Sequence, residues 1–244
     1  MTRWWCLALA ALSLVTACSH FQPAQRAPHA LGKVGDCYAA ASTGPVDCNR
    51  RHTAQTVYVG RSVAPEEAAA LVPCREAQAH FLGQDFNTRL TLRLWVAGDR
   101  SWYRCDVLLR NSTLSTRGYQ VLTGSLQGVL RRGVSIALQA CLGKPYDPGT
   151  DQTYVSCQGS HVAQELVVAP AIGTLAEAFP SDIAERAASA CNATASAAGR
   201  VGGNRKVTAY YPKNAASWAS GERTADCWVT ATNGTLPAAR PLPR

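Results

Sequence analysis

The chain has 244 residues, a formal net charge of +8, 47% hydrophobic residues and ten cysteines. Its basic residues are scattered rather than gathered among aromatic side chains, so the composition argues against a nucleic-acid-binding protein. A basic exported chain suits anionic lipid head groups or acidic wall polymers, and it equally suits an ordinary solvated surface without a charged partner.

The N-terminus has the features of an export signal. A basic start precedes an apolar run over 4–14, which is shorter than the roughly 20 residues of a membrane span. The "VTAC" that follows resembles the bacterial lipobox, in which the cysteine, here Cys18, receives lipid such as palmitate and becomes the mature N-terminus. The alternative is an ordinary cleavage site that contains Cys18 by chance. We predict a signal peptide over 1–17.

A tether is expected next, because 18–30 contains two prolines and no hydrophobic periodicity. Together with the lipobox, this predicts a protein anchored by lipid in the cell membrane, on its extracytoplasmic face. The C-terminal stretch 237–244 is rich in proline and is predicted to be a flexible tail. Loss of Arg3 with the signal peptide leaves a net charge of +7.

A sequence motif occurs twice. "VDCNRRHTAQ" contains Cys48 and His52, and "VSCQGSHVAQ" contains Cys157 and His161. Each is followed by an apolar alternation, a helical stretch with one cysteine, and a Trp-x-x-Gly-acid-Arg sequence with a cysteine shortly after it. Because four features recur in the same order, the chain is predicted to contain two copies of one unit.

The expected elements follow in the same order in each copy. The alternating stretches 54–61 and 163–169 read as half-buried strands. Pro73 suits the first turn of a helix that runs to about Leu82, and Ser181 is the expected N-cap of a second helix that ends at Gly199. The remaining strands are expected to form one hairpin in each copy, over 88–97 with 102–110, and over 206–212 with 225–232.

These elements predict an α+β protein with two similar disulfide-tied repeats, each a small antiparallel sheet with one packed helix. The repeats are placed at 31–129 and 130–236. Eight cysteines lie outside the signal peptide and the lipobox, and an even number of widely spaced cysteines in an exported chain predicts disulfides. Zinc is the alternative, although the chain contains no C-x-x-C. Repeat symmetry predicts the pairs Cys37–Cys48, Cys74–Cys105, Cys141–Cys157 and Cys191–Cys227.

Two repeated features could instead bind a ligand. His52 and His161 suit a metal site, or a structural hydrogen bond or rim position for each imidazole. Arg100 and Arg223 could hold an anion at a tight turn. In the structural interpretation, Gly98 and Gly221 supply an unusual backbone angle, each Trp covers a core and each Arg pairs with a carboxylate or carbonyl. We favour the structural interpretation for both pairs and expect no metal and no cofactor.

Motifs of catalysis are missing from the sequence. It contains no G-x-S-x-G, no H-E-x-x-H and no glycine-rich phosphate loop. We therefore expect a protein that is not an enzyme and that binds its partner at the junction of the repeats. The residues expected to bind are those that differ between the copies, namely Arg131 and Arg132 of "LRR", and Thr123 and Ser125 of "TGSL".

Several of these motifs together resemble the septum-formation domain of actinobacterial envelope proteins. The resemblance rests on "VGDC" at 34–37, the Cys–His pairs, the helix with Cys74 and the Leu-Gly after it, the Trp-Gly-acid-Arg-Cys closures and "TGSL". It implies a binding or scaffolding role in septum formation or cell division, with an envelope protein or a wall polymer as partner. The alternative is an envelope enzyme that acts on wall polymer at a site between the repeats.

Overall fold

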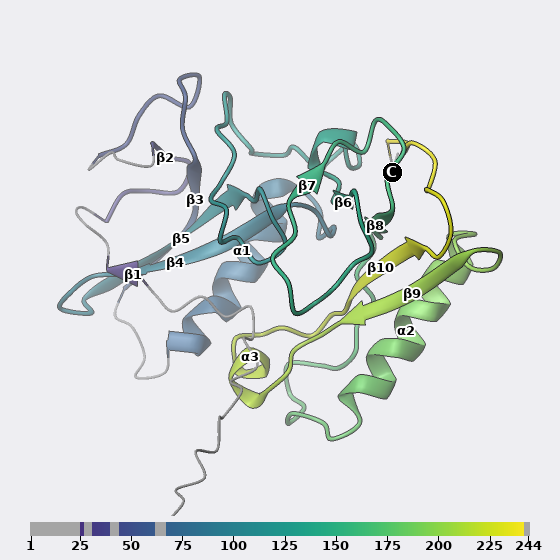
Figure 1. The fold of residues 1–244 in the computed structure, drawn as a ribbon. Helices are drawn as coiled ribbons and strands as arrows, with labels where there is room; N and C mark the ends of the chain where they lie inside the picture. Colours follow the sequence, from purple (N-terminus) through teal and green to yellow (C-terminus); the bar gives the residue numbers. More distant parts are fainter. Residues whose placement is uncertain (1–24, 27–30, 40–43, 62–66, 242–244) are drawn as a thin grey trace, which may run out of the picture.

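The computed structural model describes residues 25–26, 31–39, 44–61 and 67–241 (Figure 1). The predicted signal peptide, Cys18 and most of the predicted tether lie outside these residues. None of the described helices is both long and apolar enough to span a bilayer.

The first half of the chain forms one sheet and one long helix. Its elements are β1 (Gln25–Arg26), β2 (Cys37–Tyr38), β3 (Ala54–Arg61), a 3-10 turn (Glu67–Ala70), α1 (Leu71–Leu82), β4 (Leu90–Val96) and β5 (Trp102–Leu109). The strand order is β1-β4-β5-β3-β2, with β1 parallel to β4 and the other neighbours antiparallel. β1 is thus a short edge strand within the stretch that was predicted to be a flexible tether.

The second half repeats this plan. After a connecting 3-10 turn (Ile136–Leu138), its elements are β6 (Cys141–Leu142), β7 (Tyr154–Val155), β8 (Ala163–Glu165), α2 (Ile183–Ala197), β9 (Arg205–Tyr210), α3 (Ala215–Ala219) and β10 (Asp226–Ala231). The strand order is β7-β6-β8-β10-β9. In Figure 1, α2 lies along the β9–β10 hairpin, and α3 lies at the end of that hairpin.

The two sheets have the same topology and the same register. Four strands of the first half, in the order β4-β5-β3-β2, correspond to β9-β10-β8-β6 of the second. Cys37 of β2 lies opposite Gln55, and Cys141 of β6 lies opposite Gln164. The predicted fold class, α+β with two similar units, each an antiparallel sheet with a packed helix, is confirmed.

One face of each helix packs on its sheet. In α2, the buried residues are Ile183, Ala187, Cys191 and Ala195, spaced at the helical period. The predicted N-cap was wrong: Asp182 occupies that position and its side chain makes no capping bond. The helix of the first half starts earlier than Pro73, because a 3-10 turn leads into Leu71.

The four disulfides of the structure join Cys37 to Cys48, Cys74 to Cys105, Cys141 to Cys157 and Cys191 to Cys227. These are the pairs that repeat symmetry predicts. The second bond of each half ties the helix to a central strand, β5 or β10. All four cysteines of these two bonds are fully buried.

Two boundaries predicted from the sequence, the break between the repeats and the start of the tail, differ from those in the structure. Leu130, Val134 and Leu138 belong to the first hydrophobic core, so the break between the units comes after them rather than at 129/130. The predicted tail is also held in place up to Arg240, whose carbonyl accepts a bond of 2.8 Å from Gln139 Nε2. Ala239 is buried against the Cys141–Cys157 region. The prediction of a flexible tail was wrong for these residues because a buried amide and an apolar cluster hold them.

Candidate binding cleft between the halves

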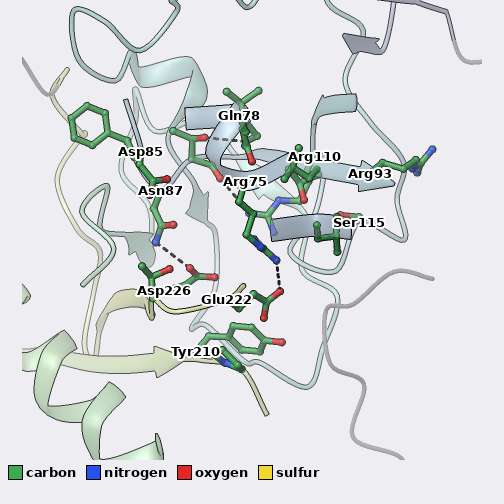
Figure 2. A pocket seen from close by; sticks show the side chains of 18 of the residues that line it. Arg75, Gln78, Asp85, Asn87, Arg93, Arg110, Ser115, Tyr210, Glu222 and Asp226 are labelled. Atoms are coloured by element: carbon green, nitrogen blue, oxygen red, sulfur yellow. Dashed lines mark hydrogen bonds and ion pairs between the residues drawn. The ribbon is translucent and has the colours of Figure 1, made fainter. Parts of the chain in front are cut away.

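A cleft of about 230 Å³ lies where the two halves meet. The first half supplies α1, the segment before β4, β4 itself and the loop after β5, whereas the second half supplies the end of β9 and the residues before β10. Figure 2 shows Arg75 near the centre, with Glu222 and Asp226 across from it. Polar side chains that line it include Arg75, Gln78, Asn87, Arg110, Ser115, Glu222 and Asp226.

Side-chain hydrogen bonds of Arg75 and Asn87 connect the halves across this cleft. Arg75 Nη2 donates to Glu222 Oε1 at 2.8 Å, and Arg75 Nε donates to the carbonyl of Ser220 at 3.0 Å. Asn87 Nδ2 donates to Asp226 Oδ1 at 3.1 Å. These contacts fix the walls relative to each other, so the cleft exists only when both halves are present.

Charge is divided between the two walls. Arg75, Arg93 and Arg110 come from the first half, and Glu222 and Asp226 come from the second (Figure 2). Exposed Asp85 is the exception, an acid on the first wall. A cleft with cations on one wall and carboxylates on the other suits a polar partner rather than an apolar ligand.

The carboxyl groups near the cleft are held in an environment that disfavours their charge. Burial raises the pKa of Glu222, and the guanidinium of Arg75 only partly opposes this shift. Burial also raises the pKa of Asp226 against the opposing effect of Arg110. Glu165, on β8 beside β10, lies behind them, and burial together with the charge of Asp226 raises its pKa well above the ordinary value.

The buried part of this junction contains unpaired polar atoms. Arg110 Nη1 and Nη2 donate to the carbonyls of Thr113 and Thr88 at 3.2 and 3.3 Å. Among the described residues, neither its Nε nor Glu165 Oε2 has a hydrogen-bond partner. A buried polar atom without a partner is costly, so a water or a ligand group is expected to bind there.

The two repeated histidines are structural. Both are about 1% exposed, so neither imidazole lies in a rim position. Nδ1 of His52 donates to the carbonyl of Arg50 at 2.8 Å, and Nδ1 of His161 donates to that of Gly159 at 3.0 Å. Their neighbouring cysteines are in disulfides. No group of three or more metal-binding side chains occurs in the described part of the chain.

The predicted binding residues Thr123 and Ser125 lie away from the cleft. Ser125 Oγ accepts a bond of 3.0 Å from Nε2 of Gln55, which is buried, and Leu126 N donates to Gln55 Oε1 at 2.7 Å. Gln55 also donates to the carbonyl of Gly35 at 3.0 Å. Gln55 of the repeated His-x-Ala-Gln motif therefore holds "TGSL" in place, and although Thr123 and Ser125 are both exposed, the Ser125 hydroxyl is hydrogen-bonded to Gln55.

Arg131 and Arg132 are exposed but do not line the cleft either. Arg131 lies over the end of α1, where its side chain covers Gly83, a residue with a φ of 99°. Leu130, just before it, is fully buried in the first core. The structure thus separates the junction from the four residues that the sequence analysis assigned to it.

The Trp-Gly-acid-Arg motif has different structures in the two halves. Trp218 is buried in α3, and its Nε1 donates to the carbonyl of Glu177 at 2.6 Å. Trp95 is only partly buried in β4, so the prediction that it covers the core was wrong. Gly221 has the expected unusual angle, a φ of 87°, whereas in the first half the positive φ, 58°, belongs to Arg100 rather than to Gly98.

The second arginine of the motif is structural, as favoured from the sequence. Arg223 Nε donates to the carbonyl of Thr174 at 2.7 Å, and Nη1 donates to the carbonyls of Trp218 and Glu222. Its guanidinium lies 3.9 Å from the centre of the Trp218 ring, which is a cation–π contact. The guanidinium of Arg223 is therefore bound by backbone carbonyls and an indole ring.

Sequence reasoning missed the cleft residues Arg75, Asn87, Glu222 and Asp226. Two of them carried a signal, because Glu222 is the acid of the repeated motif and Asp226 directly precedes a paired cysteine. Their partners could not be found, since Arg75 and Asn87 belong to the other half and the position that corresponds to Arg75 in the second half is Asn192.

Comparison with known families identifies the family of the chain. A family model described as "Septum formation" matches residues 61–227, from the end of β3 to β10, and thus takes in α1, α2, α3 and all the residues that line the cleft. No curated protein and no solved structure gives a significant match. The match spans more than half of the chain. The chain belongs to the septum-formation family.

Proposed function

We propose that this protein is a non-catalytic binding or scaffolding module of the cell envelope, and that the cleft between its halves holds its partner. The family links the chain to septum formation, and thus to cell division. The observation that supports the proposal is the cleft itself, which needs both halves and carries opposite charges on its two walls. The partner is an envelope protein or a wall polymer with polar groups of both signs.

A second candidate function is an envelope enzyme that acts on wall polymer. Carboxyl groups with raised pKa in a shared cleft are typical of general acids, and Glu222 and Asp226 have that property. Their contacts favour binding, because Arg75 and Asn87 from the opposite wall each hold one of these carboxyl groups. Release of soluble fragments from purified wall polymer, abolished by Asp226→Asn, would support the enzyme instead.

The binding proposal predicts where the partner can be captured. A photo-crosslinking residue at Gln78 or Tyr211, both in the cleft, should give the same crosslinked product in intact cells. The control position is Ser196, exposed on α2 outside the cleft, and it should give none of that product. The products are separated by electrophoresis and identified by mass spectrometry.

A different pattern would overturn the cleft assignment. If Gln78 and Tyr211 give no product while a crosslinker at Thr123 captures one, the recognition surface is the "TGSL" segment. Thermal melting of each variant ensures that a missing product does not result from unfolding.

We also propose that Cys18 is lipidated and that the protein is held on the extracytoplasmic face of the cell membrane. Support comes from "VTAC" after the apolar run. One acyl chain gives only marginal membrane binding, so we expect the mature N-terminus to carry two or three. Mass spectrometry of the purified mature protein should find them on Cys18, and an unmodified N-terminus at Ser19 or later would refute this prediction.

A further inference from the structure

Three surface loops of the first half meet around the buried Gln55. Gly124 N donates to the carbonyl of Cys48 at 2.7 Å, and Leu122 exchanges two backbone bonds with His52. Gln55 itself bonds to Gly35, Ser125 and Leu126. The loops that carry "VGDC", the Cys48–His52 stretch and "TGSL" therefore form one surface.

This surface is basic and has exposed apolar side chains. We define the basic loop surface as Lys33, Val34, Arg50, Arg51, Val121, Val129, Arg131 and Arg132, all exposed. Val34, Val121 and Val129 are 53%, 44% and 37% exposed, unusual values for valine. Two overlapping turns, in which Val129 N donates to the Leu126 carbonyl and Arg131 N donates to the Gly128 carbonyl, connect the last two arginines to "TGSL".

The acids on these loops leave an excess of positive charge. Asp36 accepts a bond from Lys33 N at 2.9 Å, and Asp47 accepts one from Asn49 N at 2.9 Å. Two carboxylates thus accompany five basic side chains. Exposed valines between arginines suit the boundary of a bilayer, where the cations meet lipid phosphates and the apolar groups enter the acyl region.

We propose that the basic loop surface docks onto the anionic lipid head groups of the membrane that carries the protein. β1 holds the chain at Gln25, seven positions after Cys18, and this segment reaches at most about 25 Å when fully extended. A lipid on Cys18 keeps this surface at a high effective concentration near the bilayer. That part of the argument rests on the proposed anchor, whereas the surface does not depend on it.

The test is hydrogen–deuterium exchange of the mature protein with an excess of lipid vesicles. One set contains phosphatidylcholine alone, and the other contains equal parts of phosphatidylcholine and phosphatidylglycerol. Exposed amides of 121–132 should exchange more slowly only with phosphatidylglycerol. This protection should disappear at about 1 M salt, where the Debye length is about 3 Å.

Charge reversal identifies the residues responsible. Arg50→Glu/Arg51→Glu and Arg131→Glu/Arg132→Glu should each weaken docking at least about thirtyfold. Arg200→Glu/Lys206→Glu, which makes the same charge change on the second half, should leave docking unchanged. Equal exchange in both vesicle types, or equal loss in the control variant, overturns the proposal, as does protection only when wall material or another protein is added.

The two proposals fail in different ways. A missing lipid is seen in the N-terminal mass, whereas a missing docking surface is seen in the exchange difference between vesicles. An anchored protein is bound equally to both vesicle types, so that difference reports only the basic loop surface.

Discussion

Replacing both partners of the second helix–strand disulfide, Cys191→Ala/Cys227→Ala, is expected to lower the free energy of unfolding by about 4 kcal/mol. The bond closes a loop with a sequence separation of 36, and its removal enlarges the unfolded ensemble. Both sulfurs are fully buried between α2 and β10, so the variant also leaves a cavity. Denaturant unfolding of the two proteins measures the difference.

The matched control is Cys141→Ala/Cys157→Ala. This bond closes a shorter loop, with a separation of 16, so the chain-entropy account predicts a smaller loss of about 3 kcal/mol. A larger loss from the shorter loop would contradict that account and assign the stabilisation to native packing around Cys141.

The substitution Trp218→Ala is expected to destabilise the protein by about 3–5 kcal/mol, the range for removal of a buried aromatic side chain. The indole is 3% exposed, packs edge-on against Phe179 and donates to the carbonyl of Glu177. It also supports the guanidinium of Arg223. A loss of this size corresponds to a fall of about 10 °C in Tm for a chain of this length.

Trp95→Ala is the matched control because it removes the same side chain from the other copy of the motif. Trp95 is only partly buried in β4, so this variant should melt much closer to the unaltered protein. Equal losses at the two positions would show that the motif supports both halves in the same way. Differential scanning calorimetry of both variants distinguishes these results.

Features that recur within the chain could be predicted from the sequence. The two hairpins, the helix of each half and the disulfide pairs are repeated, and each is set by local pattern: alternation, helical spacing and the position of a cysteine. Gly221 could likewise be assigned its backbone angle, since a tight turn needs a residue that tolerates positive φ.

Features that differ between the halves could not be predicted. Arg104 precedes Cys105 and pairs with Asp106 inside the first half, whereas Asp226, in the same place before Cys227, bonds to Asn87 across the junction. The choice between an internal and an external partner depends on how the two halves pack. Nothing in the local pattern of either repeat contains that information.

The binding residues expected from the sequence illustrate the same limit of prediction. "TGSL" and "LRR" were chosen because they differ between the copies. The structure places both on the first half, away from the cleft. A residue that differs between repeats can serve either the junction or one outer surface. Only the three-dimensional arrangement distinguishes these two cases.

The contact of Arg75 with Glu222 has a consequence for the symmetry of the molecule. If a two-fold axis related the halves, the contact of Arg75 with Glu222 would be repeated between Asn192 and Asp99, which occupy the corresponding positions. Both of these residues are exposed, and Asp99 accepts a hydrogen bond from its neighbour Ser101 instead. The contact between the halves is therefore heterologous, because it joins a patch on one half to a different patch on the other. Asn192 stands in α2 where Arg75 stands in α1, so the second half lacks the arginine with which this ion pair would be made again.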